Sequence, residues 1–367
     1  MRSGPALENL IGAVAESCRS GLDPESLRAE VLPRLRRAVP VDALWWATVD
    51  PATLLFTQAY REEIPDAVAS YFVENEFLAD DVNKWTVLAR DTVGVRTLLD
   101  ATEGSPSQSA RYRDIFQPLG LEDELRAVLR TRGVSWGYMC LHRESGSSFS
   151  QEEKALVRRL APHLAEGIRL GLLMGSVGLT NVADAPGLIA LGADGSAMSM
   201  NAPAEQWLDE LQVPSAKAEL PIEVHAVAAE LRRLGSHEPG VPRLRVLTRA
   251  GRWATLCATW LRTGDTDSIA VIIEPATPAE VAPLVMRAYG LTEHERRVTE
   301  LVCQGLSTRA ITLELHITAN TVQDHLKSIF DKIGVRSRRE LTATMLRQQY
   351  LPRAKAGQRV GPAGNFV

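Results

Sequence analysis

Apolar and polar positions change their spacing several times along the chain and so divide it into three regions. At the start, apolar residues between Leu7 and Val14 recur at helical spacing, which predicts a helix through about residue 40. Residues 42–60 then read as two strands around an Asp-Pro turn. Residues 125–143 read as a hairpin that turns near 131–133. The first region is therefore expected to be an antiparallel sheet flanked by helices.

A long amphipathic helix closes this region. Ser150 and Glu153 have the spacing of a capping box, which marks its start. Its apolar seam is Val157, Leu160, Leu164, Ile168 and Leu172. This seam is one candidate dimer contact, and a smaller one is formed by Leu341, Met345 and Leu346.

The second region predicts another small antiparallel sheet. It begins with a strand, an Asp194-Gly195 turn, a second strand, and Asn201 placed to cap a helix. Three more strands are expected at 243–249, 253–262 and 268–273. Residues 276–290, with their prolines and final glycine, predict a linker with one short helix.

The third region predicts four short helices. Thr292 with Glu295, Ser307, Thr318, and Ser337 with Glu340 occupy the capping positions. Gly305 is expected to end the first helix in the left-handed conformation, and His316 is expected to take it in the turn between the second and third. Two helices joined by such a tight turn form a helix-turn-helix module.

The third of these helices has two distinct sides. Val322, Leu326, Ile329 and Ile333 form its apolar side. The opposite side is polar and consists of Asn320, Gln323, Asp324, Lys327, Ser328 and Asp331. This stripe could face water, a protein partner or the edges of DNA bases.

The amino-acid sequence of the third region resembles the LuxR/GerE family of bacterial transcription regulators over about 55 residues. The segments that carry the resemblance are "LTEHERRV", "LVCQGLSTRAI", "LHITANTVQDHLKSIFDKIGV" and "RSRREL". Thr312 and Thr318 depart from the family's usual alanine and serine, and both are small enough to keep the packing.

The resemblance implies that the third helix enters the major groove of double-stranded DNA. It places Gln323, Asp324 and Lys327 at base contacts, and these side chains can pair with adenine, cytosine and guanine respectively. It places Thr308, Arg309 and Lys332 near phosphates. The complete expected DNA-binding set is Thr308, Arg309, Thr318, Asn320, Thr321, Gln323, Asp324, Lys327, Ser328 and Lys332. For His325, packing is favoured over a catalytic role.

The first region resembles a GAF domain and the second, more weakly, a PAS domain, both of which usually bind a small molecule or a neighbouring domain. Aromatic side chains of the first region form a candidate ligand pocket, although aromatic residues in small sheets are more often plain core. They are Trp45, Trp46, Trp85, Trp136 and Tyr138. The adjacent Asp80 and Asp81 read as a helix cap or a solvated turn.

Composition and charge narrow the class of protein. With 45% hydrophobic and 23% charged residues, the composition is that of a globular protein, and no apolar run reaches the roughly 18 residues of a membrane span. Four scattered cysteines favour neither a metal site nor a disulfide framework. Residues 291–367 carry 12 Lys and Arg against 7 Asp and Glu, a charge of +5, whereas the preceding 290 residues carry 29 against 38, or −9. A basic unit on an acidic body is common among nucleic-acid binders.

The expected fold class is therefore α+β and multidomain: GAF-like and PAS-like antiparallel-sheet sensory domains, then an all-α four-helix LuxR-type helix-turn-helix domain. The expected boundaries are 1–178, 183–275, a linker at 276–290, a helix-turn-helix domain at 291–350 and a disordered tail at 351–367.

The leading hypothesis is a cytoplasmic, sequence-specific DNA-binding transcription regulator without enzyme activity, cofactor or metal. Its expected partners are double-stranded DNA and a second copy of the chain, with a small-molecule effector and RNA polymerase as further candidates. Two alternatives remain: a sensory enzyme, or a regulator working by protein contact, each using the helix-turn-helix as a docking module. The operator, the effector and the direction of regulation are not encoded in any motif.

Overall fold

The chain divides into two compact units, each with its own set of elements. The computed structural model describes residues 4–144, 146–174, 185–211, 220–235, 240–263 and 266–345, so the tail expected at 351–367 lies outside it. Contacts assign Met1–Gly175 and Val182–Pro275 to unit 1, and Ser176–Asn181 and Ala276–Val367 to unit 2. Among the described helices, none is both long and apolar enough to cross a membrane.

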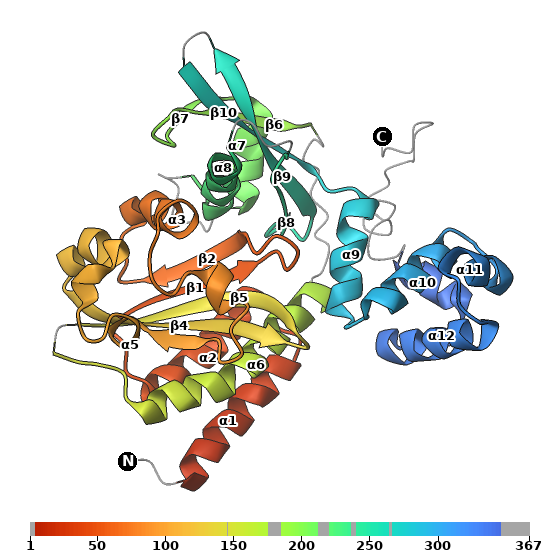
Figure 1. The fold of residues 1–367 in the computed structure, drawn as a ribbon, viewed down its shortest axis with the longest axis horizontal. Coiled ribbons are helices and arrows are strands. Elements are labelled where there is room, and N and C mark those ends of the chain that lie inside the picture. The colour runs from red at the N-terminus through yellow and green to blue at the C-terminus, as the bar shows by residue number, and fades with distance from the viewer. Residues whose placement is uncertain are drawn as a thin grey trace. The chain divides into compact units, whose positions relative to one another are not determined.

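The first half of unit 1 is a five-stranded antiparallel sheet with helices on both sides (Figure 1). The strand order is β2-β1-β5-β4-β3. Its strands are β1 (Ala43–Val49), β2 (Phe56–Glu62), β3 (Val95–Thr97), β4 (Leu121–Thr131) and β5 (Val134–Glu144). Its helices are α1 (Gly4–Arg19), α2 (Pro24–Ala38), α3 (Ala69–Phe77), α4 (Trp85–Leu88), α5 (Leu98–Ala101) and α6 (Gln151–Met174). The connections contain short helical turns at Asp66–Val68, Pro106–Gln108, Tyr112–Phe116 and Gln117–Leu119.

The hairpin of β4 and β5 turns where the sequence predicts it. Thr131 pairs with Val134, which leaves a two-residue loop, and Arg132 and Gly133 have φ values of 52° and 75°. Two consecutive left-handed residues are the requirement of a type I′ turn, which matches the twist of the strands it joins. The prediction of this hairpin is confirmed.

The prediction of one helix through residue 40 is wrong, because the segment forms two helices. Gly21 is left-handed, with φ 68°, and ends the helical run after α1. Asp23 then caps α2 by accepting hydrogen bonds from the backbone N–H groups of Glu25 and Ser26, with Pro24 at the first helical position.

Helix α6 is a core element of unit 1. It packs on β4 and β5 and beside α1 and α2. Leu164 is completely buried, as are Val157 and Leu160. A Cβ atom at Gly171 would lie 2.6 Å from the carbonyl oxygen of Leu22, so glycine is needed for this close approach. The predicted dimer seam on α6 is therefore wrong: the seam is the surface by which α6 joins its own domain.

The second half of unit 1 is another five-stranded antiparallel sheet, in the order β7-β6-β10-β9-β8. Asn201 caps α7 as predicted, by accepting from the N–H of Ala204 at 3.0 Å. Helices α7 and α8 pack on the sheet, and α8 also contacts α3 and β2 of the first half. The elements are β6 (Gly187–Leu191), β7 (Ala197–Met200), α7 (Ala202–Leu211), α8 (Ile222–Leu234), β8 (Arg243–Leu247), β9 (Trp253–Thr263) and β10 (Thr266–Pro275).

Ion pairs join the halves of unit 1. The completely buried carboxylate of Asp50 accepts from the Nη2 and Nε atoms of Arg245 at 2.6 and 2.8 Å, and from its backbone N–H at 3.1 Å. Glu74 of α3 accepts from Arg232 of α8 at 2.6 Å. The two sheets thus share polar contacts as well as one hydrophobic core cluster.

Unit 2 is helical in its described part. Its helices are α9 (Pro278–Ala288), α10 (Glu293–Cys303), α11 (Thr308–Leu315) and α12 (Ala319–Ile333), and residues 338–345 are also helical. Leu341 and Met345 are buried, and Leu346 of the smaller predicted dimer seam lies outside the described residues.

We predict that Leu164→Ala lowers the free energy of unfolding of unit 1 by about 2–5 kcal/mol, because it leaves a cavity in a filled core. Urea titration followed by tryptophan fluorescence measures this, since the seven tryptophans all lie between residues 45 and 260. Leu188→Ala, at a leucine that is 46% exposed, is the control and should cost roughly 0.5 kcal/mol or less. A Leu164→Ala protein of unchanged stability that no longer self-associates would contradict the core assignment.

Candidate functional site

Caps define the helix-turn-helix of unit 2. Thr292 and Glu295 form a complete capping box on α10. Ser307 caps α11 by accepting from the N–H of Ala310, and Thr318 caps α12 by accepting from that of Thr321, both at 3.2 Å. The caps predicted at Thr292, Ser307 and Thr318 are confirmed.

The turn between α11 and α12 is also as expected. His316 has φ 54° and ψ 40°, the left-handed conformation, and its N–H bonds the carbonyl of Thr312. Gly305 after α10 is left-handed too, with φ 85°. The helix expected after Ser337 begins slightly differently: Ser337 caps Glu340, but the Glu340 carboxylate accepts from the N–H of Arg336 and not from Ser337 itself.

The polar stripe on α12 separates into an outer and an inner part. Val322, Leu326 and Ile329 are buried, as expected for the packing side. The exposed residues of the stripe are Asn320, Gln323, Asp324, Lys327 and Asp331. Ser328 of the stripe is half-buried and bonds the carboxylate of Glu295 on α10. Lys332, at the end of the helix, is exposed but reaches the same carboxylate.

The carboxylate of Glu295 on α10 joins this helix to α12. Its Oε1 accepts from Ser328 Oγ at 2.6 Å, and Lys332 Nζ lies 2.8 and 2.6 Å from its two oxygens. Burial alone would raise the pKa of this carboxyl. The donors Lys332, Ser328 and Thr292 outweigh burial and lower the pKa to about 2. Glu295 is therefore ionised at neutral pH and holds α12 against α10.

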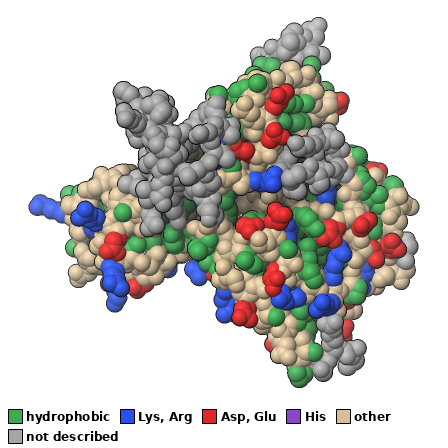
Figure 2. Space-filling model, turned by 180° about the vertical axis from the view of Figure 1, so that it is seen from behind, with side chains coloured by type: hydrophobic (Ala, Val, Ile, Leu, Met, Phe, Trp, Pro, Cys, Tyr) green, Lys and Arg blue, Asp and Glu red, His purple; other side chains and the backbone are tan. Residues whose placement is uncertain are grey.

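The remaining residues of the expected DNA-binding set lie around the start of α11 and α12. Arg309 is exposed. Thr308 Oγ1 accepts from Arg338 Nη2 at 2.9 Å, and Arg338 Nη1 donates to the Leu306 carbonyl at 3.0 Å. Thr321 Oγ1 is 2.9 Å from Thr318 Oγ1. On the face shown in Figure 2, Lys and Arg side chains project from unit 2 beside a few acidic ones, and acidic and basic side chains are interspersed on unit 1.

His325 has the packing role that the sequence favoured. Its ring lies 6.1 Å from the ring of His294, and the two planes are 19° apart. It is half-buried on α12, between the exposed and buried sides.

In unit 1, the structure brings together three of the five aromatic residues of the candidate pocket. Trp85 stacks on Tyr138 with ring centroids 4.3 Å apart, and Trp45 lies 6.2 Å from Trp85. These three belong to the core cluster, whereas Trp46 and Trp136 are buried outside it. Phe56 and Phe72, which pack on Trp45, were missed from the sequence because isolated phenylalanines carry no pocket signal.

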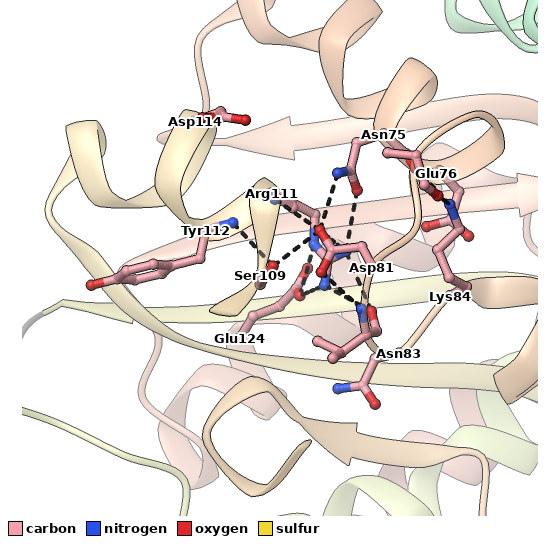
Figure 3. Close-up of polar contacts among 12 residues, drawn as sticks. Asn75, Glu76, Asp81, Asn83, Lys84, Ser109, Arg111, Tyr112, Asp114 and Glu124 are labelled. Atoms are coloured by element: carbon pink, nitrogen blue, oxygen red, sulfur yellow. Dashed lines mark hydrogen bonds and ion pairs between the residues drawn. The ribbon is translucent and has the colours of Figure 1, made fainter. Parts of the chain in front are cut away.

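Polar side chains around Arg111 and Glu124 form a buried charge network (Figure 3). Arg126 of this network lies over the Trp85 ring of the aromatic cluster, 4.6 Å from its centroid. Arg111 Nη2 donates to Glu124 at 2.7 Å, and Arg126 donates to Glu124 and Glu76 at 3.0 and 2.8 Å. All four side chains are 2% exposed or less. Burial would raise the pKa of Glu124, but the two guanidinium groups lower it to about 2.

The sequence predicts a helix cap or a solvated turn for Asp80 and Asp81, and a solvated position is found for Asp80 only. Asp80 is exposed, but the carboxylate of Asp81 is only 1% exposed and accepts from Asn75, Ser109 and the N–H of Arg111. Burial would raise the pKa of Asp81, and Arg111 with these hydrogen bonds lowers it instead. Asp81 is thus a structural residue that anchors the loop before β4.

Glu124, Cys140 and His142 bring three metal-ligating atoms within 4.8 Å of one another. Their surroundings do not suit a cation. Both oxygens of Glu124 are already bonded to arginine, so two positive charges occupy the neighbourhood of any ion. Burial raises the pKa of the Cys140 thiol well above its ordinary value, which disfavours the thiolate that metals bind.

Comparison with known proteins assigns a family to unit 2. The family model for GerE, "Bacterial regulatory proteins, luxR family", matches residues 290–345. The spore germination protein GerE of Bacillus subtilis is 39% identical over 57 residues, which cover 16% of this chain and 77% of GerE. The chain therefore belongs to the luxR family of bacterial regulatory proteins.

Other relatives share the same segment of the chain. A putative HTH-type transcriptional regulator of Aeromonas salmonicida is 47% identical over 51 residues, 14% of this chain and 26% of that protein. The probable transcriptional regulatory protein NarL of Mycobacterium tuberculosis is 34% identical over 73 residues, 20% of this chain and 31% of NarL. The chain thus spans less than a third of the length of these two relatives.

Solved structures resemble the chain more loosely. The alignment with Escherichia coli SdiA covers 92% of this chain and 96% of the SdiA chain, with 12% identity and a TM-score of 0.34. A bacteriophytochrome, RpBphP3 of R. palustris, covers 75% of this chain and 63% of its own, with 13% identity and a TM-score of 0.36. Scores of this size do not define a common fold.

We predict that Glu295→Gln weakens unit 2 at neutral pH and removes much of its acid sensitivity. With a folded pKa of about 2 against an ordinary 4.5, the carboxylate stabilises the folded state above pH 4.5, and this contribution is lost as the pH falls toward 2. Urea titrations at pH 7, 5 and 3, followed by methyl NMR signals of Leu326 and Ile329, report on this unit. Glu300→Gln on the same helix is the control. Equal pH dependence in wild type and Glu295→Gln would contradict the prediction.

Proposed function

We propose that this chain is a transcription regulator that binds double-stranded DNA by placing α12 in the major groove. The observation that carries the proposal is the exposed part of the polar stripe on α12, called the outer stripe from here on. Its residues Asn320, Gln323, Asp324 and Lys327 are exposed, while the opposite side is buried. A capped helix that projects side chains of this kind can reach base edges.

The side chains of the outer stripe have complementary base chemistry. Gln323 can pair bidentately with adenine, and Lys327 can donate to the N7 and O6 atoms of guanine. Asp324 can accept from the N4 amino group of cytosine, and its charge opposes the guanine acceptors. The three residues therefore suit sequence-specific reading better than uniform attraction to phosphate.

Phosphate contacts are proposed for exposed groups at the edges of the module. Arg309 on α11 is exposed, and so are Arg336 and Arg339 after α12. Ser328 and Lys332 are left out, because Glu295 binds both and a phosphate contact would cost Lys332 its ion pair. Thr308 accepts a hydrogen bond from Arg338, and Thr318 caps α12 with Thr321 beside it.

The proposal includes a homodimer, because one short recognition helix reads only a few base pairs and a second copy doubles the site. It also includes control of DNA binding by unit 1, whose two halves we take as the GAF-like and PAS-like domains. These domains would receive a small-molecule or protein signal. The target of regulation would be RNA polymerase. Such a protein acts in the cytoplasm. No catalytic step is part of the proposal, because relatives that match unit 2 are named as transcriptional regulators.

We predict that full-length protein binds random duplex DNA with strong salt dependence, and that Arg309→Ala weakens binding to all sequences alike. Loss of one phosphate contact should flatten the slope of log K against log salt by about 0.9. Fluorescence anisotropy between 50 and 200 mM salt measures this. Arg297→Ala, at an exposed arginine that pairs with Glu300, is the control and should leave the slope unchanged. Absence of binding at the lowest salt would refute DNA binding itself.

We predict that Asp324→Ala binds non-cognate DNA as well as wild type or better, while its discrimination at one base pair shrinks by about 1–3 kcal/mol. The reason is that a carboxylate in the groove penalises the wrong base more than it adds affinity for the right one. Selection of sites from a random duplex pool, followed by affinity measurements on single-base variants, tests it. Asp331→Ala, one exposed carboxylate further along α12, is the matched control. A base preference unaltered at every position would place Asp324 in solvent.

A further inference from the structure

We infer that Glu295 is a positioning residue for the proposed DNA contact: it holds the ammonium group of Lys332 away from DNA phosphates and so limits the sequence-independent affinity. The inference rests on the proposed function, because it concerns the same module of unit 2. Two observations carry it. A partly exposed cation lies at the edge of the outer stripe, and a nearly buried carboxylate on another helix binds this cation with both oxygens.

Lys332 lies where a phosphate contact would be expected. Asp324, Ser328 and Lys332 follow one another at intervals of four residues, so their side chains form one row along α12. The row starts in the outer stripe and ends in the last turn of the helix. The side chain of Lys332 is 30% exposed, and lysine carries its charge on a flexible four-carbon stem. Without another partner, Lys332 could therefore reach a phosphate beside the groove.

Glu295 is fixed in place from several sides. The Nζ atom of Lys332 lies 2.8 Å from its Oε1 and 2.6 Å from its Oε2. Ser328 Oγ donates to Oε1 at 2.6 Å. The N–H of Thr292 donates to Oε2 at 2.7 Å, as part of the capping box that starts α10. Because the cap and Ser328 hold the carboxylate, Glu295 cannot follow Lys332 toward DNA.

The Glu295 carboxylate depends on Lys332 for its counter-charge. Its side chain is only 5% exposed. Arg296, the next residue of α10, pairs with Glu293 instead. Moving Lys332 to a phosphate would leave a nearly buried carboxylate without a cation, which is costly. This cost is the same for every DNA sequence, so it lowers the contribution of Lys332 to all of them alike.

The ion pair of Lys332 and Glu295 changes how strongly unit 2 is attracted to DNA in general. A lysine that neutralises a phosphate releases a counterion, and each such contact adds about 0.9 to the slope of log K against log salt. Lys332 and Glu295 together carry no net charge, so one such contact is withheld for each copy of the chain. Sequence-independent attraction is then left to the exposed arginines proposed for phosphate contact.

The test measures binding of full-length protein to random duplex DNA by fluorescence anisotropy at pH 7 between 50 and 200 mM salt. Glu295→Gln gives Lys332 an uncharged partner and should steepen the slope by about 0.9 for each bound copy. Over this range of salt, affinity should fall about threefold further than in wild type. Affinity at 50 mM salt should exceed that of wild type. A purely structural role of Glu295 would lower affinity instead, because the variant weakens unit 2.

Two further variants separate the effect on Lys332 from the loss of one negative charge. Glu300→Gln removes the same charge from the same helix, at a carboxylate that pairs with Arg297, and should keep the wild-type slope. Glu295→Gln combined with Lys332→Gln exchanges the ion pair for a neutral pair and should restore the wild-type slope. Equal slopes for Glu295→Gln and Glu300→Gln, or a double variant that stays steep, would overturn the inference.

Lys332→Gln alone covers the case in which Glu295→Gln does not fold, as judged by the methyl NMR signals of Leu326 and Ile329. A lysine held by Glu295 makes no phosphate contact, so this variant should keep the wild-type slope. A slope flatter by about 0.9 would place Lys332 on phosphate in wild type and contradict the inference. Wild-type protein that binds no DNA at 50 mM salt would refute the proposed function and this inference with it. Wild-type binding with an unchanged slope in Glu295→Gln would refute only the role of Glu295.

Discussion

A carboxylate removed from water must be surrounded by donors, and this requirement determines how neighbouring elements of the chain can pack. In the first half of unit 1, Glu124 on β4 is fully buried and is held by Arg111 and Arg126. Arg126 then reaches Glu76 at the end of α3, so one strand, one helix and one loop are tied to a single charge network. Removing one member would leave a buried charge without its partner, which costs more than the pair contributes.

The same requirement acts between the halves of unit 1 and within unit 2. Asp50, in the turn after β1, is completely buried because Arg245 of β8 approaches it with three donors. Glu295, at the start of α10, is held by Ser328 and Lys332 of α12. In unit 2 this bears on the proposed DNA contact, because Ser328 and Lys332 are bonded to Glu295 whereas Gln323, Asp324 and Lys327 are exposed along the rest of α12.

Short-range features of this fold were predictable from the sequence, and long-range charge pairs were not. The caps at Ser150, Thr292 and Thr318 depend on residues three positions apart, so their spacing reveals them. The break before α2 was missed, although Asp23 and Pro24 carry the signal for a helix start. Asp50 read correctly as a turn residue, but its bond to Arg245 spans 195 positions and leaves no local pattern.

The polar stripe of α12 shows the same limit on a smaller scale. Helical spacing assigns Ser328 to the polar side and Lys332 to the end of the helix, and both are compatible with a DNA contact on chemistry alone. What distinguishes them from Gln323 and Lys327 is a carboxylate 33 and 37 positions earlier, on α10. The breadth of the proposed DNA-contact surface is therefore limited by Glu295, which binds residues at its edge, so predicting it requires the neighbouring helix α10 as well as α12 itself.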